Sequence, residues 1–499
     1  MANNIMDTKE IINAEEGEIG FVIQAKGYLL TLEGLPSARI DNIIRNGSGQ
    51  RAIVTALRED RIEALLLDRG NPKAGDKFVL NKEGVLYAFG ETLFGRAVNV
   101  LGEPIDGMGD LPKGDTPLNL EGGAPAMSAR EMMTEQLFTG MPAIDILVPI
   151  AKGQRQLVTG PISSGTTAFL ESVVANQADT DVVCIYTFIG KPVSYVEDTI
   201  GRIFSEQGNK NSIMVVAFSD EPAPMIYLAP TVALELAESF SWEGKDVLLI
   251  LDDLGSHAKY LREIALMSGQ VPGRESYPGD MFYQQAHLLE RGGRFNKSFG
   301  SGSITILPVL ETNIEDISSL ISTNLVSATD GHLFFSPLTH AEGHFPSVIP
   351  EESVTRVGRK TQSRLAKQLS IRVQTLVAEY KRQRRYLEFG TQLSENTRRT
   401  IARGETLSVF LDQEQMSFIS MEVQIILLAL VFTKLFDGKE SSFARSNRDA
   451  IVAKILKPGK NAEIASVVES AQRGSISAEQ FLRKLSATVP YFEKICQQP

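Results

Sequence analysis

A glycine-rich turn, Gly160-Pro161-Ile162-Ser163-Ser164-Gly165-Thr166-Thr167, follows the apolar run QLVTG and opens the helical segment TTAFLESVVANQ. Strand, glycine-rich turn and helix in this order are the context of a phosphate-binding loop, because backbone N–H groups and the helix N-terminus form an anion cradle. Gly160, Gly165 and Thr167 match the pattern G-x-x-x-x-G-K-[ST], but Thr166 stands where the pattern has lysine.

The missing lysine weakens the predicted phosphate site. A charge-assisted bond to phosphate contributes roughly 1.5–3 kcal/mol, so nucleotide affinity is expected to fall about tenfold to a hundredfold. On this motif alone, a connection between strand and helix that binds nothing is an equally valid interpretation. If the loop binds ATP or ADP, Gly160, Ser164, Gly165, Thr166 and Thr167 are the candidate contacts.

Near-continuous apolar runs alternate with helix-length segments from about residue 91 to 360. Buried strands of this kind predict an α/β domain with a parallel sheet covered on both faces, in which ligands bind at the carboxyl ends of the strands. The runs are QLVTG (156–160), VVCIYTFIG (182–190), SIMVVAF (212–218), DVLLILDD (246–253) and SITILPVLET (303–312).

Two carboxylates, Asp252 and Asp253, end the strand DVLLILDD. This is the arrangement of a Walker B strand, which positions Mg²⁺ through its water shell. Thr167 and Asp252 are therefore the candidate magnesium residues if a nucleotide is bound. A strand end followed by an aspartate-capped turn is the alternative without a metal.

The flanking segments predict two further domains. Short alternating segments broken by turn residues indicate an N-terminal β-barrel within residues 1–90, preceded by a polar extension at 1–17. Helical spacing in residues 361–499 predicts a C-terminal α-helical bundle. Its first helix has an apolar stripe with charged residues opposite, and on it lie most of Leu365, Leu369, Ile371, Val373, Leu376 and Tyr380. The central domain then spans 91–360.

Composition restricts the partners. The net charge of −11 argues against a nucleic-acid surface, and two cysteines fit a reducing compartment. The apolar stretch Ile425–Phe432 has eight residues, far fewer than the roughly 20 that span a bilayer. The N-terminus resembles neither a secretory signal nor a transit peptide, so we expect membrane contact only through partner subunits.

Several longer segments, in order, resemble the α- and β-type subunits of rotary ATPases over about residues 20–435. They are LFGRAVNVLGEPIDGMG (93–109), TGMPAIDILVPIAKGQRQLVTGP (139–161), DEPAPMIYLAP (220–230), VPGRESYPGDMFY (271–283), LLER (288–291) and TNLVSATDGHLFF (323–335). The resemblance implies that the central domain is RecA-like.

Within that family the chain resembles the noncatalytic α-type of F-type ATP synthases. The β-type pattern has a water-activating glutamate after Gly190 and the α-type has glutamine, whereas this sequence has Lys191. SVTRVG (353–358) resembles the α-type segment whose arginine enters the neighbouring β site, which implies that Arg356 is an arginine finger. Ser327 likewise matches an α-type residue at the catalytic interface.

The α-type nucleotide pocket is only partly retained. Gln413 and Gln415 match the glutamines at the adenine end, but His340 and Phe345 stand where the family has an aromatic residue and an arginine. The resemblance also implies an N-terminal helix that docks the peripheral stalk. Only about 17 mostly polar residues precede the barrel here, which leaves stalk attachment open.

The resemblance implies a noncatalytic subunit that alternates with a catalytic β-like subunit around a γ-like shaft, with peripheral-stalk subunits as further partners. The complex is expected at the cytoplasmic side of a membrane, in proton transport coupled to ATP. One alternative is a pseudo-subunit of a specialised rotary ATPase or ion pump. A self-sufficient hexameric ATPase is a further alternative, but it needs the loop lysine and catalytic glutamate that Thr166 and Lys191 replace.

Overall fold

The computed structural model describes most of the chain, in two compact units. Unit 1 comprises residues 1–131, 180–311 and 316–329, and unit 2 comprises 132–179, 312–315 and 330–499. The described residues are 18–81, 86–112, 114, 116–117, 120, 122–205, 209, 211–271, 273, 276–312, 319–388, 394–459 and 461–496. The polar extension at 1–17, which leaves stalk attachment open, lies outside them.

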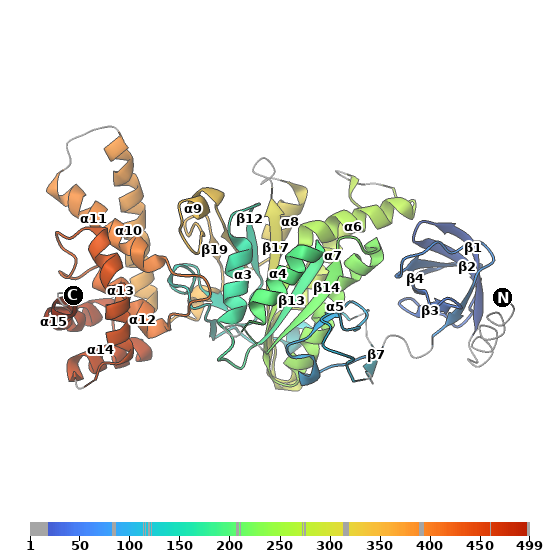
Figure 1. Cartoon of the computed structure of the whole chain (residues 1–499), viewed down its shortest axis with the longest axis horizontal. Helices are drawn as coiled ribbons and strands as arrows, with labels where there is room; N and C mark the ends of the chain where they lie inside the picture. The colour runs from blue at the N-terminus through green and yellow to red at the C-terminus, as the bar shows by residue number, and fades with distance from the viewer. Residues whose placement is uncertain are drawn as a thin grey trace. The chain divides into compact units, whose positions relative to one another are not determined.

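Unit 1 begins with the predicted N-terminal barrel (Figure 1). Six strands close in the order β1-β2-β5-β4-β3-β6 around a core of leucine, isoleucine, valine and Phe78. Exposed and buried residues alternate over the first four residues of β1, as the sequence pattern predicts for a half-buried strand. The strands are β1 Ile19–Lys26, β2 Leu29–Gly34, β3 Ile43–Asn46, β4 Arg51–Leu57, β5 Ile62–Leu66 and β6 Lys77–Leu80.

Five parallel strands of unit 1 form most of the predicted central sheet, in the order β17-β15-β13-β14-β8. They are β8 Ala97–Asn99, β13 Val183–Lys191, β14 Ser212–Phe218, β15 Asp246–Asp252 and β17 Ser303–Thr312. Almost every side chain of β13, β14 and β15 is buried, as expected for a sheet covered on both faces. The parallel α/β prediction is therefore confirmed.

Helices and short strands complete unit 1. The helices are α4 Val193–Ile203, α5 Ala223–Trp242, α6 Leu254–Met267, α7 Met281–Glu290 and α8 Leu320–Ala328, with short turns η1 Glu91–Leu93, η2 Met127–Ala129 and η4 Lys297–Phe299. Asp253 caps α6 by accepting a hydrogen bond from the Ser256 N–H. The short strands are β7 Leu86–Tyr87, β9 Thr116–Pro117 and β16 Gly293–Arg294.

Unit 2 contains the glycine-rich turn and the C-terminal helices. Strand β12 Gln156–Pro161 lies parallel to β18 Gly331–Phe334, which pairs antiparallel with β19 Val354–Thr355. β10 Gln136–Leu137 and β11 Ile150–Ala151 form a small antiparallel pair. The helices near these strands are α2 Pro142–Asp145, α3 Thr166–Ala175 and α9 Pro337–Ala341, with the turn η5 Gly358–Lys360.

Within the described residues, six helices form the C-terminal bundle of unit 2 (Figure 1). They are α10 Arg364–Glu388, α11 Glu395–Leu411, α12 Met421–Leu430, α13 Ser441–Leu456, α14 Ala462–Arg473 and α15 Ala478–Cys496. Leu365, Leu369, Val373 and Leu376 of the predicted stripe are buried. The prediction is wrong for Ile371, which is 60% exposed because it lies off the i, i+4 row of the other apolar residues.

A buried carboxylate joins the start of unit 2 to the bundle. Asp145 accepts hydrogen bonds from the Thr139 N–H and hydroxyl, the Gly140 N–H and the Gln424 amide, at 2.8–3.0 Å. Burial raises the pKa of Asp145 to about 6. The hydrogen bonds favour the charged form and oppose this rise, but burial has the larger effect. Gln362 adds two hydrogen bonds to the carbonyl oxygens of Asp145 and Ile146. The Gln424 hydrogen bond therefore links α2 to α12, and the other three to the Asp145 carboxylate hold residues 139–140 against α2.

Candidate functional site

The glycine-rich turn adopts the strand-turn-helix geometry that the sequence predicts. It connects β12 to α3, and Gly165 at the start of α3 has a φ of +84°. A side chain at Gly165 would also collide with Ser347 Oγ and His340 Nδ1, at 2.5 and 2.8 Å from its Cβ. Glycine is therefore required here by both conformation and space. Gly165 is the N-cap residue of α3 and has no side chain that could cap the first N–H groups of the helix.

Polar atoms line this turn without a charged group of the P-loop type. The Ser347 hydroxyl donates to the Ser164 carbonyl at 2.5 Å, and Ser164 Oγ is buried with no hydrogen-bond partner among the described residues. Thr166, at the lysine position, is buried and neutral, and Thr167 is half-buried. A buried hydroxyl without a partner at the loop is compatible with a bound phosphate, which would accept its hydrogen bond.

The two predicted adenine-end glutamines differ in burial. Gln413 is buried, its N–H donates to the Phe345 carbonyl at 2.8 Å and its amide donates to the Ser417 carbonyl at 2.9 Å. Its Oε1 is buried without a partner in the described chain, as is expected of an acceptor that waits for a donor such as an adenine amino group. Gln415 is exposed. Ser164 Oγ and Gln413 Oε1, which are buried and lack hydrogen-bond partners among the described residues, therefore fit a bound nucleotide. The lysine of a P-loop is replaced by the neutral Thr166.

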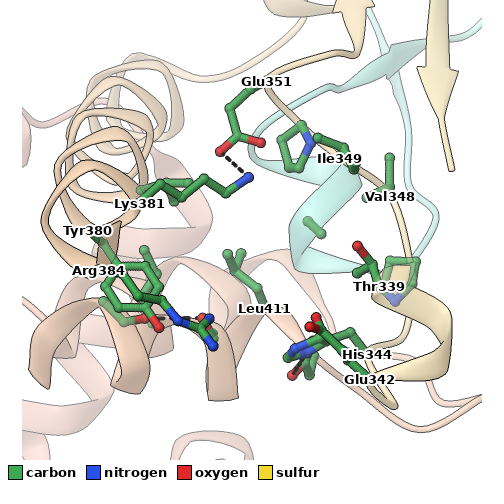
Figure 2. A pocket seen from close by; sticks show the side chains of 18 residues that line it. Thr339, Glu342, His344, Val348, Ile349, Glu351, Tyr380, Lys381, Arg384 and Leu411 are labelled. Atoms are coloured by element: carbon green, nitrogen blue, oxygen red, sulfur yellow. Dashed lines mark hydrogen bonds and ion pairs between the residues drawn. The ribbon is translucent and has the colours of Figure 1, made fainter. Parts of the chain in front are cut away.

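A cavity of about 220 Å³ lies beside this end of unit 2. In Figure 2, Tyr380, Lys381 and Arg384 of α10 face Thr339, Glu342 and His344 across it. His344 Nδ1 lies 2.7 Å from Asp412 Oδ2, and Lys381 Nζ lies 2.9 Å from Glu351 Oε1. Lys381 is therefore engaged in an ion pair on a wall of the cavity.

The predicted arginine finger follows directly on an edge strand. Arg356 is exposed, one residue after β19, and its N–H donates to the Asp330 carbonyl at 3.0 Å. The Arg155 guanidinium grips the Asp330 carboxylate with two hydrogen bonds at 2.8 and 3.0 Å. This forked pair fixes the carbonyl that anchors the Arg356 backbone.

The other side of the Arg356 segment is fixed by close packing. The Thr355 hydroxyl donates to the Pro149 carbonyl at 2.9 Å, and a Cβ on Gly358 would lie 1.7 Å from that carbonyl oxygen. No larger residue fits at 358 without moving backbone. Ser327, the second predicted interface residue, is exposed on α8 of unit 1, where its hydroxyl donates to the Thr323 carbonyl at 2.8 Å.

Sequence reasoning missed a charge cluster at the carboxyl ends of three neighbouring strands in unit 1. Lys191 ends β13, Asp252 ends β15 and Glu311 lies at the end of β17. Lys191 Nζ lies 2.8 Å from Asp252 Oδ1, 3.0 Å from Glu311 Oε1 and 3.6 Å from Asp253 Oδ2. The sequence did contain a signal for this cluster. Each of the three residues lies at or beside the end of a predicted parallel strand, where the side chains of neighbouring strands meet.

The cluster determines the charge state of Lys191. Burial alone would lower the pKa of this ammonium, but Asp252, Asp253 and Glu311 outweigh burial and raise it above its usual value. The pKa of Asp253 is raised, first by burial, and the neighbouring Asp252 adds to the effect while Lys191 opposes it. Lys191 is therefore a cation at neutral pH and cannot accept a proton from water.

Comparison with known proteins agrees with this architecture. Residues 140–355 match the ATP synthase alpha/beta family, nucleotide-binding domain, and residues 362–487 match the ATP synthase alpha/beta chain, C terminal domain. The chain belongs to the ATP synthase alpha/beta family. These two matches, together with the closed barrel and the strand order of the central sheet, confirm the predicted three-part fold. The domain boundaries at 90 and 360 stay a prediction.

Three similar proteins of this family are named as alpha subunits. ATP synthase subunit alpha 1 of Dinoroseobacter shibae is 36% identical over 446 residues, covering 88% of this chain and 86% of its own. ATP synthase subunit alpha 1 of Shewanella frigidimarina is 35% identical over 421 residues, covering 84% and 81%. ATP synthase subunit alpha of Dehalococcoides mccartyi is 33% identical over 464 residues, covering 92% and 91%. The chain is thus an alpha-like family member.

None of the helices in the described part of the chain has the length and apolar character that a bilayer crossing needs.

Proposed function

We propose that this chain is a noncatalytic α-like subunit of an F-type rotary ATP synthase or ATPase and donates Arg356 to the catalytic site of a neighbouring β-like subunit. The observation that carries the proposal is the exposure of Arg356 on a segment whose backbone is fixed through Asp330, Thr355 and Gly358. A guanidinium presented in trans neutralises charge on the transferring phosphoryl group, an effect of roughly 10³–10⁵ in rate.

In this proposal the subunit does not hydrolyse ATP at its own nucleotide site. A general base is needed where Lys191 stands, and an ammonium held by carboxylates cannot serve as one. ATP or ADP would bind weakly through Gly160, Ser164, Gly165, Thr166 and Thr167 at the phosphates and through Gln413 and Gln415 at the base. When bound, Mg²⁺ would supply positive charge at the phosphates near Thr167. Ser327 would contribute to the interface with the β-like subunit.

The proposed partners are a catalytic β-like subunit in an alternating ring, a γ-like shaft and peripheral-stalk subunits. In this proposal the ring lies on the cytoplasmic side of a membrane, attached through other subunits, and works in proton transport. The alpha-subunit relatives, which match over more than 80% of their length, support this assignment.

The test is Arg356→Ala in the ring assembled with its β-like partner. We expect at least a hundredfold lower kcat for ATP hydrolysis, measured on rings that assemble to the same size as the wild type. Arg359→Ala is the matched control, since Arg359 is an exposed arginine three residues further on. Near-normal turnover in the Arg356 variant would remove the finger role.

A second candidate function is a pseudo-subunit of a specialised rotary ATPase or ion pump. Replacement of both the loop lysine, by Thr166, and the α-type glutamine, by Lys191, favours it. Subunits that co-purify with the chain distinguish the two functions: a full proton-channel set supports the synthase. ATP hydrolysis by the purified chain alone would instead support a self-sufficient hexameric ATPase.

A further inference from the structure

The carboxylates at the ends of β15 and β17 form a cation-binding set. Asp252, Asp253 and Glu311 each offer an oxygen, and these oxygens all lie within 4.8 Å of one another. Carboxylate oxygens at such spacing suit a hard divalent cation such as Mg²⁺ or Mn²⁺. The two aspartates are buried, so their charge is costly unless a cation accompanies it.

Lys191 already provides that cation. Its Nζ touches all three carboxylates, at 2.8, 3.0 and 3.6 Å, and its side chain is only 8% exposed. The Tyr195 ring lies 5.1 Å from the same Nζ, a distance at which an aromatic face stabilises an ammonium. The ammonium is thus enclosed by its ligands and is not a surface partner.

The remaining lone pairs of Asp252 are also occupied. Its Oδ2 accepts hydrogen bonds from the Tyr186 and Tyr195 hydroxyls, both at 3.0 Å. Oδ1 has no aligned hydrogen bond from the described residues and faces the Lys191 ammonium as an ion pair. A magnesium ion bound directly to these oxygens would lie about 2.1 Å from each, so it would have to displace Nζ. Direct coordination of magnesium by Asp252 therefore does not fit while Lys191 is in place.

We propose that Lys191 is a built-in replacement for a divalent cation, and that Asp252, Asp253 and Glu311 form a latent metal site that opens when its ammonium is removed. The wild-type cluster then has the Lys191 ammonium as its cation and needs no metal in that place. The proposal concerns the cluster alone and does not depend on the role of Arg356.

The test is the binding of Mn²⁺ to the full-length, nucleotide-free chain. Binding is measured as the decrease of the EPR signal of free Mn²⁺. We expect Lys191→Gln to gain one Mn²⁺ site at least tenfold tighter than any wild-type binding. Adding Asp252→Asn to that variant should remove the gain. Lys191→Arg, which keeps a cation, should gain nothing, and neither should Lys245→Gln, which breaks the ion pair of another lysine of unit 1 with Glu91.

Thermal unfolding gives an independent readout. The melting temperature of Lys191→Gln should fall without metal and rise again with Mn²⁺, while that of the wild type should not respond. A folded Lys191→Gln variant that binds no Mn²⁺ overturns the proposal. If that variant does not fold, Mn²⁺ binding to the wild type tests the proposal. A wild-type Mn²⁺ site that Asp252→Asn abolishes would overturn the proposal as well.

Discussion

The backbone N–H of Arg356 donates a hydrogen bond to the carbonyl oxygen of Asp330 at 3.0 Å. Asp330 is in turn held by two hydrogen bonds from the Arg155 guanidinium, and its own N–H donates to the Arg155 carbonyl at 2.8 Å. The start of β12 thus fixes the backbone from which Arg356 projects.

Truncation of the Asp330 carboxylate should therefore weaken the proposed finger without removing it. In the assembled ring we expect Asp330→Ala to lower kcat for ATP hydrolysis about tenfold with KM little changed, because a misplaced guanidinium stabilises the transition state less. Arg403→Gln is the control, since it breaks an exposed ion pair with Asp437 elsewhere in unit 2. An equal loss in both variants would point to general destabilisation.

Restoring the loop lysine should restore phosphate affinity. Thr166→Lys should tighten binding of a fluorescent ATP analogue to the purified chain by about tenfold to a hundredfold, because a charge-assisted bond to phosphate contributes roughly 1.5–3 kcal/mol. Thr166→Met has similar length without charge and serves as the control. An equal gain with methionine would mean that side-chain bulk, not charge, limits binding.

Removal of the buried Asp145 carboxylate should destabilise unit 2 strongly. Asp145→Ala leaves four donors without an acceptor, at about 1 kcal/mol or more each, so the free energy of unfolding should fall by about 3 kcal/mol or more. Urea unfolding at pH 8 measures the loss. Asp437→Ala, which removes only an exposed ion pair, should change stability by less than about 1 kcal/mol.

Acid should destabilise unit 1 through a buried histidine. Burial lowers the pKa of His257 from 6.5 to about 4, and its Nε2 lies 3.1 Å from the Tyr227 carbonyl. Between these values the unfolded chain binds the extra proton, so stability is present above pH 6.5 and is lost as the pH falls toward 4.

Between pH 8 and pH 5, the free energy of unfolding of the wild type should therefore fall by about 2 kcal/mol more than that of His257→Gln. Glutamine keeps a donor for the Tyr227 carbonyl but does not titrate. Trp242, the only tryptophan, lies on α5 in unit 1 and reports unfolding of this unit by fluorescence. Parallel pH profiles for the two proteins would contradict the assignment to His257.

Local sequence signals predicted the elements well and their long-range contacts poorly. The strand ending in Asp252 and the turn from Gly160 to Thr167 were predicted because apolar runs and glycines are local signals. The ion pair of Lys191 with Asp252 depends on β13 and β15 being neighbours, and continuous apolar runs do not specify strand order. Ile371 was misplaced because apolar character alone does not decide which face of α10 is buried.

The hydrogen bonds around Asp145 also constrain how unit 2 opens. Its carboxylate binds residues 139–140 on one side and Gln424 of α12 on the other, while Gln362 binds the carbonyl oxygens of Asp145 and Ile146. Separating α12 from α2 would break the Gln424 hydrogen bond and leave the Asp145 carboxylate without that donor. Amide protons in the two helices should therefore exchange with deuterated water at a common rate, as parts of one cooperative unit.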